Sequence, residues 1–269
     1  FRRKPCAVLG MGGFASGPGG LMAWLIRKPL LVHEQNAVPG LTNKVLAKLA
    51  DVVLQAFPSV FNKAVTTGNP VRKSICEIKA PEQRELDHDG NLRLLVVGGS
   101  LGAVKLNEII PQALSQIEVG KRPSVIHQTG TRNIDAAKAM YAEAGVEAKV
   151  EAFIDDMPAV YEWADLVICR SGAMTVFELA AAGAASILVP YPFAVDDHQT
   201  SNAHYLEDAG AAIIKQQDEL STDWLVEVIN DFSSNRNKLL DMAKAARKLA
   251  IPDSAKTIAD ACLKAGGVV

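Results

Sequence analysis

The stretch LLVVGGSLGA, residues 94–103, joins an apolar run to a turn with three glycines. An apolar run that leads into a glycine turn and a helix is typical of a parallel α/β architecture. The glycines let backbone N–H groups approach an anion closely, and the following helix adds its positive dipole end. Ser100 can cap that helix and offer its hydroxyl to a phosphate oxygen. A tight strand-to-helix connection uses the same residues, so the turn alone leaves phosphate binding and a structural role open.

Outward from this turn, the chain alternates short apolar runs with helical segments, which indicates a doubly wound α/β fold. The predicted strands are Ala7–Met11, Leu30–Glu34, Val52–Ala56, Leu92–Val97, Ser124–Gln128, Val150–Ile154, Leu166–Cys169, Ala185–Val189 and Ala211–Lys215. The predicted helices include Leu41–Ala50, Ala103–Gln116, Ile134–Ala144, Thr175–Ala182, Gln199–Asp208, Thr222–Phe232, Arg236–Leu249 and Ser254–Lys264.

A domain boundary is predicted within Gly68–Glu85, where a Gly-Asn-Pro turn signal and a polar segment precede a new strand. The strand–helix units from Leu92 to Leu249 suffice for one doubly wound domain, whereas Phe1–Arg72 holds too few for a second. The sequence begins without methionine, almost directly on a strand of buried type. We therefore expect that residues upstream of Phe1 were lost or never included.

A second glycine-rich turn, GMGGFASGPGG at residues 10–20, loosely matches the dinucleotide-binding fingerprint. Glu34 ends the next strand about 20 residues later, so an NAD-binding domain is one interpretation. Against it, Pro18, Gly19 and Gly20 should delay the helix that the fingerprint requires and leave it short. A backbone surface for a polar ligand is the interpretation that we favour.

A third turn, RSGAMT at residues 170–175, follows a predicted strand and begins another helix. Such turns lie at the edge where open α/β sheets bind ligands. Glu178 follows within an otherwise apolar helical run. Its carboxylate could accept hydrogen bonds from two vicinal ribose hydroxyls, or only favour the helix N-terminus by roughly 0.3–1 kcal/mol.

Composition excludes several classes of protein. Hydrophobic residues make up 49% and charged residues 22%, which is typical of a folded domain and not of a disordered chain. The four cysteines form no C-x-x-C pair, which favours a reducing compartment over a zinc site or a disulfide framework. The uncharged window Pro5–Ile26 contains six glycines and two prolines, so we reject a transmembrane helix there.

Charge is distributed unevenly along the chain. Residues 1–50 carry seven Lys or Arg residues and one Glu, although the net charge of the whole chain is −2. A basic segment of this kind indicates an anionic partner. The segment has few aromatic residues and no nucleic-acid-binding motif, so we predict no nucleic acid partner. Trp24 beside Arg27 and Lys28 favours an anionic membrane surface, with a solvated basic face as the plain alternative.

Six motifs occur in the order found in the MurG family of bacterial glycosyltransferases. They are HEQN at 33–36, GNPVR at 68–72, GGSLGA at 98–103, FIDDM at 153–157, RSGAMT at 170–175 and DHQTSNA at 197–203. The chain closely resembles this family over nearly its whole length. The resemblance implies a GT-B α/β fold, in which two Rossmann-like doubly wound domains face each other across a cleft. The first domain would be incomplete in this chain, and a C-terminal helix, 253–269, would pack back on it.

The resemblance also implies an activity. It is the metal-independent, inverting transfer of N-acetylglucosamine from UDP-N-acetylglucosamine (UDP-GlcNAc) to the muramyl 4-hydroxyl of undecaprenyl-linked lipid I. The product, lipid II, serves peptidoglycan synthesis, and through it cell shape and division. Residues 1–72 would be the acceptor and membrane side, and residues 73–252 would bind UDP-GlcNAc. The resemblance implies no cofactor and a peripheral location on the cytoplasmic face of the bacterial inner membrane.

The resemblance assigns donor contacts by motif position. Ser100 and Arg72 would contact the diphosphate, with Arg72 also at the hinge between the domains. Ile154 would pair the uracil edge through its backbone, and Glu178 would hold the ribose hydroxyls. The residues that would line the diphosphate and ribose are Ala173, Met174, Thr175, Val176 and Phe177.

The sugar contacts follow in the same way. Gln199, whose amide offers both a donor and an acceptor, would read the sugar hydroxyls, with Asn202 nearby. Asn36 would reach the donor sugar from the other domain.

The sequence departs from the family at one motif. The family's Gly-Gly-Thr-Gly-Gly-His loop, which carries a histidine proposed in catalysis, is absent here. The remaining candidates for proton transfer are His33 and Glu34, at the end of a predicted strand that would face the cleft. A structural histidine is the alternative for His33. His198 has similar standing, and its motif position favours a ligand-facing role. No metal ligands are predicted.

Two other functions stay open. The chain as given could be only a UDP-sugar-binding module, because its second domain looks complete and its first does not. A GT-B isomerase, a UDP-GlcNAc 2-epimerase, would share the fold, but the ordered motifs disfavour it. The NAD-dependent interpretation lacks a second element of the fingerprint.

Overall fold

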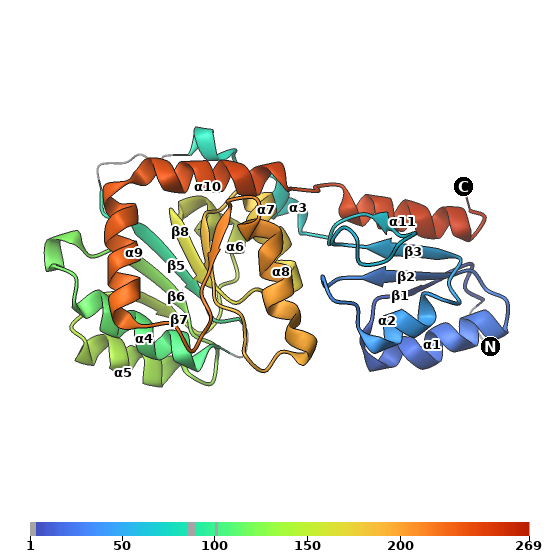
Figure 1. Cartoon of the computed structure of the whole chain (residues 1–269), viewed down its shortest axis with the longest axis horizontal. Helices are drawn as coiled ribbons and strands as arrows, with labels where there is room; N and C mark the ends of the chain where they lie inside the picture. The colour runs from blue at the N-terminus through green and yellow to red at the C-terminus, as the bar shows by residue number, and fades with distance from the viewer. Residues whose placement is uncertain (1–3, 85–89, 100–101, 269) are drawn as a thin grey trace. The chain divides into compact units, whose positions relative to one another are not determined.

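A computed structural model describes residues 4–84, 90–99 and 102–268. The chain forms two compact units. Unit 1 comprises residues 1–72 and 251–269, and unit 2 comprises residues 73–250. Each unit has a parallel β-sheet of its own (Figure 1).

Unit 1 is built on a four-stranded parallel sheet in the order β1-β2-β3-β4. Its strands are β1 (Val8–Gly10), β2 (Leu30–Glu34), β3 (Val52–Gln55) and β4 (Val65–Thr66). Its helices are α1 (Gly13–Leu25), α2 (Leu41–Leu46) and α11 (Ser254–Ala265). Figure 1 shows α1 and α2 on one side of the sheet, where Ala23 and Leu46 pack on β2 residues, and α11 on the other.

Helix α1 corrects a prediction. We expected Pro18, Gly19 and Gly20 to delay this helix, yet it begins at Gly13 and runs through all three residues. The reason is packing. A Cβ atom at Gly20 would lie 2.8 Å from both methyl carbons of Leu46, so this glycine lets α1 approach α2 closely. The tertiary contact outweighs the intrinsic cost of about 1 kcal/mol for a glycine inside a helix.

Among the described residues, no helix is long and apolar enough to span a bilayer.

Unit 2 is built on a six-stranded sheet in the order β10-β9-β8-β5-β6-β7, in which all neighbours are parallel. The strands are β5 (Arg93–Val97), β6 (Ser124–Gln128), β7 (Lys149–Glu151), β8 (Leu166–Cys169), β9 (Ser186–Leu188) and β10 (Ala212–Ile214). The chain leaves β5 toward β6 and later returns to its other side at β8. The boundary between β5 and β8 is therefore the topological switch point, where doubly wound sheets bind ligands.

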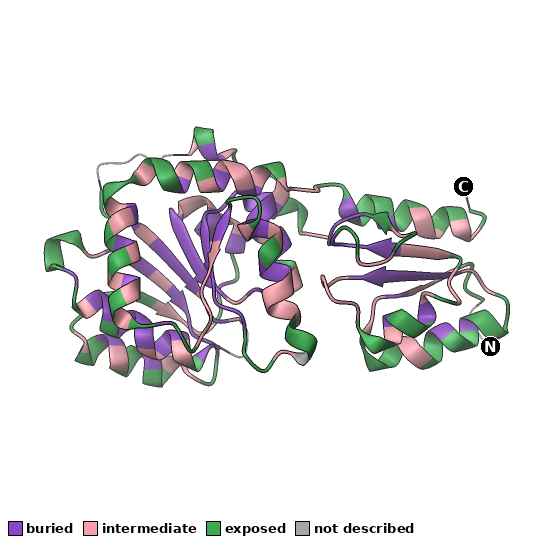
Figure 2. Ribbon diagram, viewed as in Figure 1, coloured by how far each residue is buried: buried purple, intermediate pink, exposed green. Residues whose placement is uncertain are grey.

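Helices flank both faces of this sheet (Figure 1). They are α3 (Lys73–Cys76), α4 (Val104–Ser115), α5 (Ile134–Glu143), α6 (Met157–Trp163), α7 (Ala173–Ala182), α8 (His198–Glu207), α9 (Thr222–Ser234) and α10 (Arg236–Lys248). Short 3-10 helices occur at η1 (Pro81–Gln83), η2 (Val119–Lys121) and η3 (Val195–Asp197). The central strands β5, β8 and β9 are largely buried while the outer helix faces are exposed, as Figure 2 shows, because helices cover both faces of a parallel sheet.

Two strands differ from the prediction by more than one residue at an end. We expected β7 to continue to Ile154, but it ends at Glu151, because the Ile154 N–H donates to Gln128 Oε1 at 3.0 Å and not to a strand. Strand β4 was not predicted. It has only two residues, both exposed, so it shows no apolar run.

Candidate functional site

The switch point of unit 2 carries a pocket of about 760 Å³. It is bordered by the turn after β5, the turn after β8, the segment after β9, and residues of α4, α7 and α8. The residues that line it are Gly98, Gly99, Gly102, Ala103, Val104, Lys105, Glu108, Arg170, Gly172, Thr175, Tyr191, Gln199 and Gln217. All of them belong to unit 2.

The turn after β5 needs its glycines. Gly99 and Gly102 have φ angles of +81° and +79°, in the left-handed region that favours glycine. A Cβ atom at Gly102 would overlap the Thr129 carbonyl oxygen, and one at Gly98 would lie 2.7 Å from the Ala103 nitrogen. The turn is therefore compact and brings the start of α4 to the pocket. Ser100, the predicted phosphate contact, lies outside the described residues.

The turn after β8 brings the N-terminus of α7 to the same pocket. Gly172 is the N-cap, and Ala173, Met174 and Thr175 form the first turn. No carbonyl of the same helix can accept from the N–H groups of a first turn, so these groups can bind an anion. Val176 and Phe177 are 0% and 2% exposed because the helical period turns them toward the core, so only their backbone could meet a ligand.

Glu178 lies three residues beyond Thr175, on the same face of α7, and is half-buried. The hydroxyl of Tyr161, a residue that is 1% exposed, donates to Glu178 Oε2 at 3.3 Å. This contact limits the directions in which the carboxylate can point. Glu178 does not border the 760 Å³ pocket itself, but lies along α7 from its wall.

Gln199 borders the pocket at the start of α8. Its Oε1 accepts a hydrogen bond from the Tyr191 N–H at 2.9 Å. One of the two lone pairs of its amide oxygen is thus used within the protein, although we expected the whole amide to be available to a ligand. Asn202 lies one turn further and is fully buried, and its Nδ2 donates to the Ser171 carbonyl at 3.3 Å. It joins α8 to the turn after β8 and presents no exposed side chain.

Ile154 is 4% exposed, and its N–H already donates to Gln128. A uracil contact through this N–H would require the Gln128 carboxamide to move. The contact stays a prediction.

The motif assignments missed several residues at the pocket, among them Lys105, Arg170 and Gln217. One sequence signal could have found Lys105. It stands in the first turn of α4, where a cation is unfavourable beside the helix dipole unless an anion binds there. The contacts of Gln217 depend on tertiary structure and leave no local signal.

His33 is completely buried in unit 1. Its Nε2 lies 3.0 Å from the Gly68 carbonyl oxygen, which can only accept, so Nε2 carries the proton. Burial lowers the pKa of His33, against smaller raising effects of Gly68 and Glu34, and favours the neutral ring.

Glu34 is 3% exposed and holds the loop that follows β2. Its carboxylate accepts from the N–H groups of Asn36 and Gly40 at 2.9 and 3.1 Å, and from Asn43 Nδ2 at 2.9 Å. Asn36 itself is half-buried, and Arg72 is exposed at the end of unit 1. The roles predicted for these four residues stay predictions.

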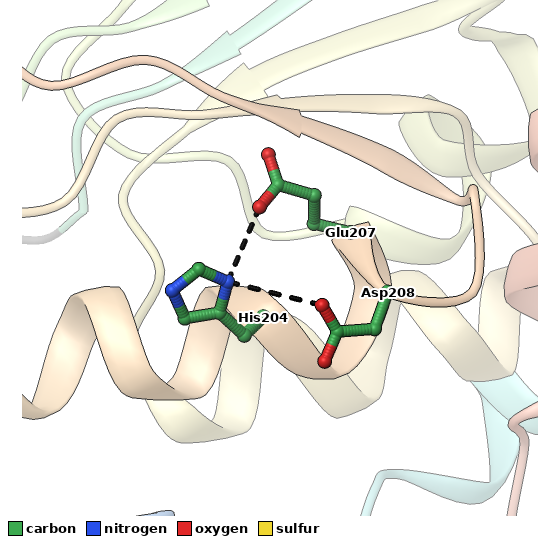
Figure 3. Close-up of side chains that lie close together, drawn as sticks. All are labelled: His204, Glu207 and Asp208. Atoms are coloured by element: carbon green, nitrogen blue, oxygen red, sulfur yellow. Dashed lines mark ion pairs between the residues drawn. The ribbon is translucent and has the colours of Figure 1, made fainter.

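Among the described residues, one cluster could in principle hold a metal ion (Figure 3). His204 Nδ1 lies 3.2 Å from Glu207 Oε2 and 4.0 Å from Asp208 Oδ1, all near the end of α8. His204 and Asp208 are exposed, and Glu207 Oε1 accepts from the Ile214 N–H at 3.0 Å. The cluster is explained as a surface contact that joins α8 to β10, and we assign no metal to it.

Two α/β units with parallel sheets, one of which has a pocket at its switch point beside a helix N-terminus, are typical of the GT-B class. Known families agree. The profile of the glycosyltransferase family 28 C-terminal domain matches residues 93–258, and that of the family 28 N-terminal domain matches residues 2–55. The chain belongs to glycosyltransferase family 28.

Individual relatives narrow this further. The "UDP-N-acetylglucosamine--N-acetylmuramyl-(pentapeptide) pyrophosphoryl-undecaprenol N-acetylglucosamine transferase" of Marinobacter nauticus is 53% identical over 98% of this chain and 74% of its own length. The crystal structure of Acinetobacter baumannii MurG superposes with a TM-score of 0.86 at 43% identity, over 96% of this chain and 73% of that one. The predicted GT-B fold and the resemblance to the MurG family are confirmed.

The same fold occurs in an isomerase. The UDP-GlcNAc 2-epimerase of Neisseria meningitidis, solved with UDP-GlcNAc bound, has a TM-score of 0.64 but only 14% identity, over 97% of this chain and 76% of that one. This likeness concerns the fold alone.

Proposed function

We propose that this chain transfers N-acetylglucosamine from UDP-GlcNAc to the muramyl 4-hydroxyl of lipid I, and so makes lipid II for peptidoglycan synthesis. The observation that carries the proposal is the relative in Marinobacter nauticus, which bears the corresponding name and is 53% identical over 98% of the chain. The pocket at the switch point of unit 2 suits the donor, because a glycine turn, the N-terminus of α7 and two cations, Lys105 and Arg170, border it.

In the proposed reaction, the acceptor hydroxyl attacks C1 of the sugar from the face opposite to UDP. The new C–O bond forms as the bond from C1 to the phosphate oxygen breaks, and a base takes the hydroxyl proton. UDP gains negative charge as it leaves. The glycine turn, the N-terminus of α7 and Lys105 would stabilise that charge without a metal.

We propose donor contacts that fit the observed positions. Ser100 and the first-turn N–H groups of α7 would bind the diphosphate, and Ile154 would meet the uracil. Glu178 would hold the ribose hydroxyls, and Gln199 would bind the sugar. Asn202 would position α8 through its hydrogen bond to the Ser171 carbonyl, since its side chain is buried.

The buried pair in unit 1 has a different role in this proposal. His33 and Glu34 bind the backbone of Gly68 and of the loop after β2. They would act by holding the loop that carries Asn36, and not by taking the acceptor proton.

The proposal is tested by calorimetric titration of UDP-GlcNAc into this chain, with NAD as control ligand, followed by an assay with a lipid I analogue. We expect selective binding of UDP-GlcNAc and formation of the disaccharide product. Binding without turnover would reduce the chain to a UDP-sugar-binding module. Conversion of UDP-GlcNAc to UDP-N-acetylmannosamine without an acceptor would favour the epimerase. No binding by a chain shown to be folded would overturn the proposal.

The membrane part of the proposal rests on the surface of α1 and α2, which Figure 2 shows as largely exposed. Its exposed large apolar residues are Phe14, Leu21, Met22, Trp24, Leu25, Ile26, Leu41 and Val45. Exposed cations, Arg27, Lys44 and Lys48, lie among them in the sequence. Apolar side chains beside cations suit the interface of an anionic bilayer. We propose that unit 1 binds the cytoplasmic face of the bacterial inner membrane peripherally.

Replacing both Trp24 and Leu25 by serine should weaken binding to anionic vesicles at least about tenfold, because two large apolar side chains no longer enter the interface. Flotation with phosphatidylglycerol vesicles measures this. Val119→Ser, which changes an even more exposed apolar residue in unit 2, is the control. Unchanged flotation of the double variant would remove the patch from the proposal. Equal flotation of the unaltered chain with phosphatidylcholine vesicles would remove the charge argument.

A further inference from the structure

Arg170 is half-buried directly after β8 and borders the pocket. Its Nη1 donates to the carbonyl oxygens of Val189 and Pro190, both at 3.0 Å, and its Nη2 donates to Gln217 Oε1. The guanidinium carbon also lies 5.6 Å from the centre of the Tyr191 ring. Arg170 is thus bound to the segment after β9 and to the segment after β10.

The Pro190–Tyr191 peptide links Arg170 to Gln199. Arg170 binds the carbonyl of this peptide, and the N–H of the same peptide donates to Gln199 Oε1 at 2.9 Å. Because the peptide is trans, its C=O and N–H point in opposite directions. By binding the carbonyl oxygen, the guanidinium fixes the orientation of this peptide plane. The same orientation sets the direction in which the N–H donates to Gln199.

This link decides how Gln199 can meet a ligand. A backbone N–H only donates, so the amide oxygen of Gln199 must face it, and the NH₂ group must point away. The backbone of Gln199 is fixed as well. Asp196 and Asp197 precede α8 with φ angles of +52° and +47°, and the Thr200 hydroxyl donates to Asp197 Oδ1 at 2.7 Å.

We propose that Arg170 is a positioning residue that acts through the Pro190–Tyr191 peptide and makes Gln199 a hydrogen-bond donor toward the sugar of the donor substrate. Gln199 then recognises an oxygen of the sugar, a hydroxyl or the acetamido carbonyl, and Arg170 need not touch the ligand. The inference rests on the proposed function. It adds how the protein would distinguish UDP-GlcNAc from UDP, which lacks the sugar.

The test compares UDP-GlcNAc with UDP, because UDP lacks the group that Gln199 would bind. Arg170→Lys keeps the charge but cannot hold two carbonyls and Gln217 with one planar fork. By calorimetry, we expect the affinity for UDP-GlcNAc to fall about tenfold, the value of roughly one hydrogen bond, while the affinity for UDP stays unchanged. Equal losses for both ligands would mean that Arg170 contacts the nucleotide directly, and no loss for either would also overturn the inference.

A double-mutant cycle tests the route through Gln199. In a Gln199→Leu background, Arg170→Lys should have no further effect on UDP-GlcNAc affinity. A tenfold effect that persists in that background would overturn the inference.

Gln217→Leu provides a milder variant, in case Arg170→Lys folds poorly. It removes one partner of Arg170 and should cause the same selective loss on a smaller scale. Equal losses of UDP and UDP-GlcNAc in this variant would count against the inference. Failure of the unaltered chain to bind UDP-GlcNAc would overturn the proposed function, whereas normal binding without selective losses in the variants would overturn this inference alone.

Discussion

Replacing Gly102 by alanine should lower the free energy of unfolding of unit 2 by about 3 kcal/mol or more, because backbone strain and a steric clash would add together. The φ angle of Gly102 is +79°, which a residue with a Cβ atom adopts only at a cost. The added Cβ would also overlap the Thr129 carbonyl and lie 2.5 Å from Asn133 Nδ2. Thr129 is fully buried and cannot retreat without moving the end of β6. Urea unfolding, followed by circular dichroism, measures the loss.

Two matched glycines separate the clash from the strain. Gly99 has a φ angle of +81° but no atom within 4 Å of an added Cβ, so Gly99→Ala should cost only about 1–2 kcal/mol. Gly120 has neither a positive φ angle nor a close neighbour, so Gly120→Ala should be nearly neutral. If Gly102→Ala proved no worse than Gly99→Ala, the close approach of the turn to Thr129 would be wrong.

Replacing Glu178 by alanine should lower the affinity for UDP-GlcNAc about 100-fold, because the carboxylate would lose two charge-assisted hydrogen bonds to the ribose. The Tyr161 hydroxyl donates to one carboxylate oxygen of Glu178, so part of the entropic cost of ordering this side chain is met before the ligand binds. Titration calorimetry measures the effect. Glu178→Gln should lose less, since an amide oxygen remains to accept one hydroxyl.

The ribose assignment has its own controls. A UDP analogue without the two ribose hydroxyls should bind the unaltered chain and Glu178→Ala equally well. Glu162→Ala is the matched variant, because Glu162 lies on α6 beside Tyr161 and pairs with Lys79 at the surface, 3.6 Å away. Undiminished affinity in Glu178→Ala, with Glu162→Ala also unaffected, would remove Glu178 from the site.

The sheet of unit 2 could be predicted because its strands are buried on both faces and read as apolar runs. Leu166–Cys169, for example, is fully buried and has the bounds expected from the sequence. The end of β7 could not be predicted in the same way. Residues 152–154 are apolar, but Phe153 is 55% exposed and Ile154 is held by the Gln128 side chain. An apolar run does not show which partner receives its N–H groups.

Glycine misled the prediction in unit 1. Intrinsic propensity treats Gly20 as a helix breaker, whereas in the fold it is the contact point between α1 and α2. The fact that decides the case, the position of Leu46, lies 26 residues away and becomes visible only in three dimensions.

At the site, two residues singled out by motif position, Thr175 and Gln199, border the pocket, and their contacts with a ligand stay predictions. Motif position could not show that one lone pair of the Gln199 amide oxygen is already used, because that depends on the Tyr191 N–H. Motif position also put Val176 and Phe177 among the ligand contacts, although their side chains are buried. The helical period alone would have placed these two side chains on a different face of α7 from Thr175. Arg170 stands in the motif at residues 170–175, yet its hydrogen bonds go to acceptors 19, 20 and 47 residues further along the chain.

The strand order of unit 2 has a consequence for synthesis on the ribosome. Strand β5 pairs with β6, which follows it closely in the chain, and with β8, which is made much later. The β5–α4–β6 segment can thus assemble while the rest of the unit is still being translated, since short loops close at the lowest entropic cost. The pocket cannot, because its wall includes Gln199 and Gln217 as well as Gly98. A nascent chain released before Gln217 would therefore contain much of the sheet and still lack a complete donor pocket.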